Sequence, residues 1–182
     1  MKKIYIALLL AFYGQSVSMF AQDVWKITAD SIKLDNYYGI TVANGMVGLV
    51  SSPEPLKLSQ IVLGETYDVY GRGRVKNFLH GMNMMDVELR IDGTLVTFAK
   101  ISNFSQTLDM RRGIFGGMFD YKSCVHVEYE YTALRHLPYS CLLSVTVIPH
   151  EDVELSVANV LSTHESLRES QESFHRVFNG KI

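Results

Sequence analysis

The feature that most constrains this chain is a strict alternation of apolar and polar residues. Val87, Leu89 and Ile91 are separated by single charged residues. Successive side chains of a β-strand point to opposite faces, so this spacing predicts a strand with one buried face. Asp92-Gly93 follows directly, and an Asp-Gly pair between two apolar runs indicates a tight hairpin turn.

The same alternation recurs further along the chain, and no stretch before Ser162 shows helical periodicity over three turns. Period-2 patterning with polar opposite faces is typical of antiparallel sheets that bury one face. The chain is therefore predicted to be all-β, an antiparallel β-sandwich. The other alternating sets are Val125, Val127, Tyr129 and Tyr131; Leu143, Val145 and Val147; and Val153, Leu155 and Val157.

The N-terminus has the pattern of a secretory signal peptide. Two lysines precede the apolar run from Ile4 to Phe12, and small Ala21 closes a polar exit region. The apolar run is shorter than the ~20 residues that span a bilayer. We expect residues 1–21 to be a cleavable signal, the mature protein to be secreted or periplasmic, and no membrane association after cleavage. A buried N-terminal strand or helix is the alternative.

Charge argues against nucleic acid as a partner. The 182 residues carry 17 Lys+Arg against 19 Asp+Glu, a formal net charge of -2. Nucleic-acid-binding proteins usually present a basic face, and membrane-surface segments carry runs of Lys and Arg. Neither feature is present in this sequence.

The two cysteines are expected to be free thiols. A hairpin centred between the two strands would place Cys141 opposite Glu130, six positions from Cys124. Six residues of strand span about 20 Å, whereas a disulfide needs Cα atoms within roughly 7 Å.

The expected domain organisation is a signal at 1–21, a β-sandwich at 22–161 and the start of a linker at 162–182. The stretch from Ser162 to Phe174 is rich in Ser, Glu, His and Arg, which favours a linker over a short amphipathic helix. Pro53 and Pro55 place residues 51–58 in a loop or at a sheet edge.

Motifs for catalysis or metal binding are scarce. The six histidines show no His-Glu-x-x-His spacing and there is no Cys-x-x-Cys, so we expect no metal site and no cofactor. Asp86 and Glu88 share one strand face and could be imagined as an acid/base pair, but a solvated outer face is the preferred interpretation. No catalytic residue is assigned.

Three residues are candidates for contact with a sugar. Tyr37 and Tyr38 could offer aromatic stacking surfaces, and Arg72, between two glycines, could donate hydrogen bonds. The alternatives are a tyrosine pair divided between core and rim, and a surface turn that exposes Arg72.

Four segments between Trp25 and Leu161 form an ordered set of motifs: Asn44-Gly45-x-x-Gly48 within residues 37–48, Gly64-Glu65-Thr66-Tyr67-Asp68, the strand and turn from Asn83 to Gly93, and Leu108-Asp109-Met110-Arg111-Arg112-Gly113. Together, in this order, they resemble the opening part of the family-65 glycoside hydrolases and phosphorylases. In the first motif, Asn44-Gly45 suits a turn with positive φ, and Gly48 would allow a neighbouring segment to approach closely. In the last, Asp109 and Arg111 are candidate motif or interface residues.

The resemblance implies a galactose-mutarotase-like super-sandwich that precedes a linker and an (α/α)6 barrel. The family's catalytic residues lie in that barrel, so this chain is expected to be the non-catalytic N-terminal domain of a secreted hydrolase of α-linked glucosides, inactive alone. A hydrolase is preferred over a phosphorylase because phosphorolysis suits the cell interior. The implied partners are the barrel and an oligo- or disaccharide.

The alternative function is a stand-alone carbohydrate-binding or structural module. If the barrel is absent, an apolar patch near residues 37–47 should remain exposed and cause self-association.

Overall fold

The computed structural model describes residues 23–68, 77–162 and 175–181. These residues form strands and two short 3-10 helices, η1 (Leu34–Asn36) and η2 (Phe98–Lys100). The strands are β1 (Lys26–Ala29), β2 (Thr41–Ala43), β3 (Val47–Ser51), β4 (Leu58–Asp68), β5 (Asn77–His80), β6 (Asn83–Ile91), β7 (Thr94–Leu95), β8 (Ile101–Asp109), β9 (Ile114–Tyr121), β10 (Val125–Ala133), β11 (Cys141–Pro149), β12 (Glu154–Ser162) and β13 (His175–Lys181). Among the described residues, no helix is long and apolar enough to cross a membrane.

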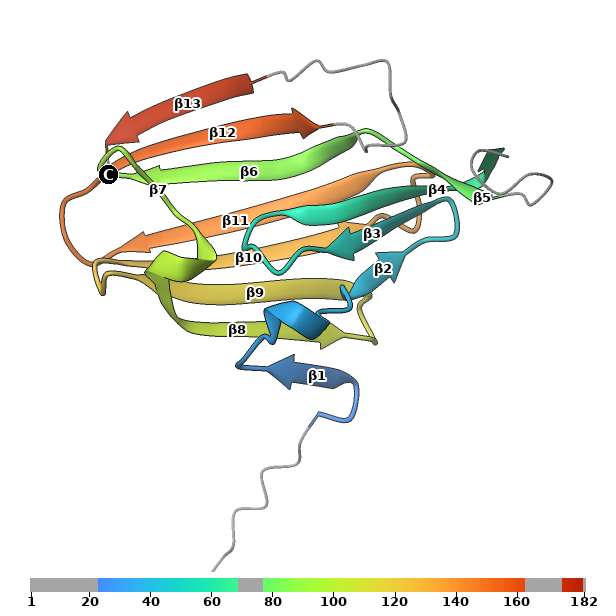
Figure 1. Ribbon diagram of the computed structural model, residues 1–182, viewed down its shortest axis with the longest axis horizontal. Coiled ribbons are helices and arrows are strands. Elements are labelled where there is room, and N and C mark those ends of the chain that lie inside the picture. The colour runs from blue at the N-terminus through green and yellow to red at the C-terminus, as the bar shows by residue number, and fades with distance from the viewer. Residues whose placement is uncertain (1–22, 69–76, 163–174, 182) are drawn as a thin grey trace, which may run out of the picture.

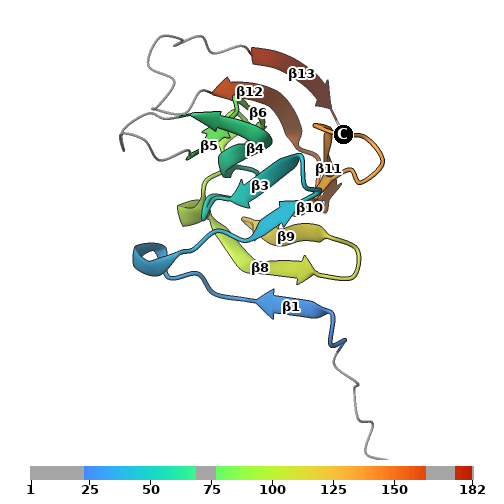
Figure 2. The ribbon, with the colours of Figure 1, turned by 90° about the vertical axis from the view of Figure 1, so that its right-hand side faces the viewer.

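The strands are arranged in two layers (Figures 1 and 2). One layer is a five-stranded sheet in the order β1-β8-β9-β10-β11. The other contains two four-stranded sheets, β13-β12-β6-β7 and β2-β3-β4-β5, which meet where the Val87 N–H donates to the Leu56 carbonyl at 3.0 Å. Every strand pair is antiparallel, and β2 and β3 contact β10 across the layers. The predicted all-β antiparallel sandwich is confirmed.

The core contains the alternating residues that the sequence indicates. Val125 and Tyr131 of β10 have no exposed surface, and Leu89 and Ile91 of β6 are 1% exposed. The predicted hairpin turn is also present, with φ of 49° at Asp92 and 72° at Gly93. The alternation succeeds as a predictor because each strand has one face against the other layer.

The two cysteines are free thiols, as expected, but the predicted register of their hairpin is wrong. Cys141 pairs with Ala133, and Glu130 pairs with Ser144. The connection between β10 and β11 is longer than expected and includes residues 134–140, which shifts the pairing by three residues. Cys124 is therefore even further from Cys141 than the sequence suggested.

Within residues 37–47, where an exposed apolar patch is expected, Tyr38 is exposed but Val42 and Val47 are buried. Val42 and Val47 are 5% and 4% exposed, because β2 and β3 turn these side chains toward β10. Exposed apolar side chains collect instead around Met82 and Tyr139.

The C-terminal segment contains a strand. Residues 175–181, which the sequence assigns to a linker, form β13 and pair with β12 in the register Glu154↔Lys181 to Val160↔His175. The expected signal peptide and the Ser- and Glu-rich stretch at 163–174 lie outside the described residues.

Candidate functional site

The three candidate sugar-contact residues do not form one site. The Tyr37 hydroxyl is 2.6 Å from Ser51 Oγ and donates to Gln106 Oε1 at 3.2 Å, so Tyr37 links β3 to β8. Tyr38 is 85% exposed and is free to stack on a ligand. Arg72 lies outside the described residues. This arrangement matches the alternative interpretation of the tyrosine pair, in which Tyr37 packs inward and Tyr38 stands at the rim.

Asn44 fastens the β2–β3 turn to the β10–β11 connection. Its Oδ1 accepts the backbone N–H groups of Met46 and Val47, each at 2.9 Å. Its Nδ2 donates to the Leu134 carbonyl at 2.8 Å, 90 positions away in sequence. Gly45 has φ +94°, the positive value that the Asn-Gly pair predicts. Asn44 and Gly45 are therefore structural residues of this turn.

The close approach predicted at Gly48 occurs at Gly64 instead. A Cβ on Gly48 would be 3.7 Å from the Ala43 Cβ, an ordinary contact. A Cβ on Gly64 would collide with the Gly45 carbonyl oxygen, and the Gly64 N–H donates to the Met46 carbonyl at 2.7 Å. Two of the segments that carry the family resemblance thus interlock, because β4 crosses the Asn44 turn at Gly64.

Asp109 and Arg111 belong to the turn between β8 and β9. Asp109 is 7% exposed, and its Oδ1 accepts the Arg112 N–H at 2.9 Å. The Gly113 N–H donates to the Asp109 carbonyl at 2.8 Å, with φ +68° at Gly113. Arg111 is exposed on this turn. Asp109 shapes the turn, and Arg111 is available for contact with a partner.

An apolar pocket of about 470 Å³ lies beside the Asn44 turn, and we call it the methionine pocket. It opens between the two layers, where β6 begins and the β10–β11 connection ends. Its lining residues are Val47, Ile61, Leu63, Gly81, Met82, Met84, Met85, Tyr139, Ser140 and Cys141. The sequence reasoning missed it, although three of the chain's eight methionines fall within residues 82–85.

A second, polar hollow of about 380 Å³ lies on the outer face of the five-stranded sheet. Two cross-strand rows line it: Ser105, Met118, Glu128 and Thr146, and Thr107, Gly116, Glu130 and Ser144. Gly116 has no side chain, so the second row is open between Thr107 and Glu130. The hollow offers hydroxyl donors and two exposed carboxylates, groups that can hydrogen-bond a polyol.

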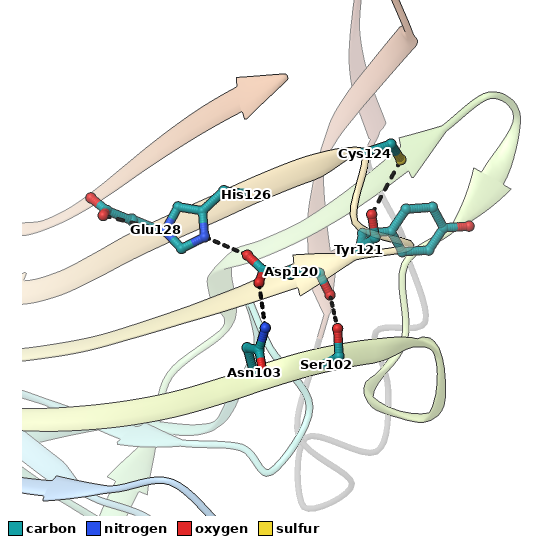
Figure 3. A network of polar contacts seen from close by, with 7 residues as sticks. All are labelled: Ser102, Asn103, Asp120, Tyr121, Cys124, His126 and Glu128. Atoms are coloured by element: carbon teal, nitrogen blue, oxygen red, sulfur yellow. Dashed lines mark hydrogen bonds and ion pairs between the residues drawn. The ribbon is translucent and has the colours of Figure 1, made fainter. Parts of the chain in front are cut away.

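A histidine network borders this hollow (Figure 3). His126 Nδ1 is 2.6 Å from Asp120 Oδ1, and its Nε2 is 3.4 Å from Glu128 Oε1. Asn103 Nδ2 donates to Asp120 Oδ2 at 2.7 Å. The hydrogen bond to Asp120 raises the pKa of His126, and the bonds from Asn103 and His126 lower the pKa of Asp120. The network favours a charged pair in mildly acidic solution.

The structure does not support the acid/base pair imagined from the sequence. Asp86 is not on a solvated face, because its Oδ1 accepts the Leu58 N–H at 2.9 Å and Asn83 Nδ2 at 2.8 Å. Burial raises the pKa of Asp86 despite these hydrogen bonds. Glu88 Oε2 is 3.8 Å from Arg90 Nη2 at the surface. Asp86 therefore joins β6 to the start of β4.

Within the described ranges, no group of three or more His, Cys, Asp or Glu side chains could hold a metal ion. The exposed carboxylates Glu128 and Glu130 stand on an open sheet face. General acid catalysis at a glycosidic oxygen needs a protonated carboxyl of raised pKa next to the bond that breaks. The geometry at this face serves binding better than hydrolysis.

The sequence matches the family model for the N-terminal domain of glycosyl hydrolase family 65 over residues 39–182. It is 45% identical over 164 residues to a kojibiose hydrolase of Flavobacterium johnsoniae, covering 90% of this chain and 24% of that protein. It is 42% identical over 169 residues to a kojibiose hydrolase of Mucilaginibacter mallensis, covering 93% of this chain and 25% of that protein. The chain thus spans about a quarter of the length of these relatives. On this evidence, with the β-sandwich that the structure shows, the chain belongs to glycosyl hydrolase family 65 and corresponds to the family's N-terminal domain.

Proposed function

We propose that this chain is the non-catalytic N-terminal domain of a secreted hydrolase of α-linked glucosides, with kojibiose as the first substrate to test. The observation that carries the proposal is its 45% and 42% identity to a quarter of two kojibiose hydrolases. Hydrolysis is then the task of an (α/α)6 barrel outside this chain, the partner that the family resemblance implies.

The side chains support a non-catalytic role. Asp86 is engaged in holding β4 against β6, and Glu128 and Glu130 are exposed. An enzyme that cleaves glycosides by inversion needs a carboxylic acid on one side of the bond and an activated water opposite. Removing one member of a catalytic group commonly lowers turnover by orders of magnitude.

The expected secretion favours a hydrolase over a phosphorylase. The basic residues, apolar run and Ala21 at the N-terminus fit a secretory signal. A phosphorylase consumes phosphate and releases a sugar phosphate, which are best kept inside the cell. Secretion is tested by expressing the full chain in a Gram-negative host and sequencing the N-terminus of the exported product, with Gln22 expected as its first residue.

The test of catalysis uses purified residues 22–182 with trehalose, maltose, kojibiose and nigerose, with and without phosphate. We expect no turnover under conditions in which the Flavobacterium johnsoniae enzyme cleaves kojibiose. Turnover by the isolated chain that is lost in Glu128→Gln or Glu130→Gln would overturn the proposal. Glu65→Gln and Asp68→Asn, in the family-like segment of β4, are tested in the same way, and a loss of turnover in either would also overturn the proposal.

A stand-alone carbohydrate-binding module is the second candidate, favoured by the polar hollow and by exposed Tyr38. Titration with kojibiose monitored by NMR distinguishes the two sites. Binding in the hollow should shift amides of β9 and β10 and be weakened by Glu130→Gln. Binding at Tyr38 should be weakened by Tyr38→Ala alone.

A further inference from the structure

Three exposed apolar side chains are grouped at the methionine pocket. Met82 is 46% exposed, Met84 is 58% exposed and Tyr139 is 49% exposed, and all three line the same pocket. Isolated exposed apolar residues are ordinary, but contiguous ones around a hollow mark surfaces that are covered by a partner.

The walls of this pocket are held in place by contacts between distant segments. Asn44 holds the β10–β11 connection through the Leu134 carbonyl, and the Tyr139 hydroxyl donates to the Gly64 carbonyl at 3.3 Å. On the opposite wall, the Gly81 N–H donates to the Ile61 carbonyl at 2.7 Å. The pocket is therefore formed before any partner binds, which lowers the ordering cost of association.

The lining chemistry suits an apolar protein side chain rather than a sugar. Apart from backbone groups, its polar atoms come from the Ser140 hydroxyl, the Cys141 thiol and the Tyr139 hydroxyl. Both hydroxyls already donate hydrogen bonds, to the Pro138 and Gly64 carbonyls. Sugars require several converging hydrogen-bonding groups. Methionine side chains are flexible and polarisable, and they adapt to the shape of an apolar partner.

We propose that the methionine pocket is the docking surface for the catalytic part of the same protein, and that it receives an apolar side chain from that part. This inference rests on the proposed function. About three quarters of each relative's length lies outside the region matched by this chain, so a large partner of fixed stoichiometry is expected. A second copy of this chain is the competing occupant.

The strand register sets how far the polypeptide that connects β13 to the catalytic part must extend before that part can reach the pocket. Lys181 pairs with Glu154, near the Ile91 end of β6, whereas the pocket lies at the Asn83 end. At ~3.3 Å per extended residue, roughly ten residues would reach back along a strand as long as β6.

The experiment uses a chimera in which residues 23–182 replace the matched N-terminal part of the Flavobacterium johnsoniae kojibiose hydrolase. Met84→Asp places a charge in the pocket. Ile148→Asp is the matched control, because Ile148 is 43% exposed on the outer face of β11. Both substitutions are also made in isolated residues 23–182, where the unfolding midpoint should stay close to that of the parent.

On heating, the unmodified chimera should unfold in one transition. The Met84→Asp chimera should unfold in two, one for the N-terminal domain and one for the catalytic part. Because a buried apolar side chain typically stabilises an interface, heat inactivation of Met84→Asp should be about ten- to a hundredfold faster. Ile148→Asp should behave as the unmodified chimera. Two transitions before any substitution, or equal behaviour of both variants, would overturn the docking proposal.

The remaining outcomes separate docking from function. A chimera that unfolds as one unit and is uncoupled by Met84→Asp but cleaves no α-glucoside would contradict the proposed function and leave docking supported. If isolated residues 23–182 form a dimer that Met84→Asp dissociates and Ile148→Asp does not, the occupant is a second copy and the proposal is wrong.

Discussion

The Asn44 turn and the outer face of the five-stranded sheet are stabilised by different kinds of contact. At the turn, backbone groups of β2, β3, β4 and the β10–β11 connection are bound by Asn44 and by the close crossing at Gly64. On the outer face, Asp120 and His126 meet as side chains that are each about a quarter exposed. Unpaired buried backbone groups and steric collisions cost far more than a lost exposed ion pair.

This comparison predicts the largest effect at Gly64. Gly64→Ala should destabilise residues 23–182 by roughly 3 kcal/mol, because its Cβ would displace the Gly45 carbonyl and the turn around it. Gly48→Ala is the control: it makes only ordinary contacts, and its expected effect ranges from none to a stabilisation of about 0.5–1 kcal/mol. Urea unfolding measures both, and equal losses would refute the assignment of the close approach to Gly64.

Asn44→Ala should follow, with a loss of about 2 kcal/mol. The substitution leaves the N–H groups of Met46 and Val47 and the Leu134 carbonyl without their partner. Asn159→Ala removes a comparable side chain from an exposed position, where Asn159 Nδ2 donates to the Met84 carbonyl at 2.9 Å, and should cost less than about 1 kcal/mol. A larger loss for Asn159→Ala in the same unfolding assay would reverse the comparison.

The smallest effect is expected at His126, and it should depend on pH. The pKa of His126 is raised, so its contribution is fully present below its ordinary value of 6.5 and is lost as pH rises through the folded pKa. The pKa of Asp120 is lowered, so its contribution is present above 3.8 and is lost as pH falls through the folded pKa. The two windows overlap between these values.

His126→Asn should therefore lose most stability near pH 5, by less than about 1 kcal/mol, and little at pH 9. Glu128 and His150 also act on this pair, so Glu128→Gln and His150→Asn are measured alongside it. A loss at pH 9 as large as that at pH 5 would show that His126 contributes by packing rather than by charge.

The fold class and much of the core follow from local periodicity. The alternation around Leu89 and Tyr131 identifies buried faces because a strand's geometry assigns each side chain to a face without reference to the rest of the chain. The Asp92-Gly93 turn is equally local. The family resemblance also comes directly from short segments, and the match over residues 39–182 confirms it.

The roles of the motif residues depend on contacts that no local pattern contains. Sequence alone placed the close approach at Gly48, whereas the crossing of β4 over the Asn44 turn places it at Gly64. Periodicity also left the β10–β11 register three residues out, because a long connection does not fix the pairing of the strands it joins. Sequence alone does not decide whether Tyr37 packs inward or faces a sugar, because its hydrogen-bond partner Gln106 is 69 positions away.

Sequence by itself thus determined which faces are buried, where the tight turn lies and to which family the chain belongs. Tertiary structure alone decided that Met82 and Met84 meet Tyr139 in one pocket and that His126 lies between Asp120 and Glu128. The physical reason is that burial within a strand is a local property of its alternation. A pocket or a network, by contrast, forms only where separate strands, each with its own register, are brought side by side.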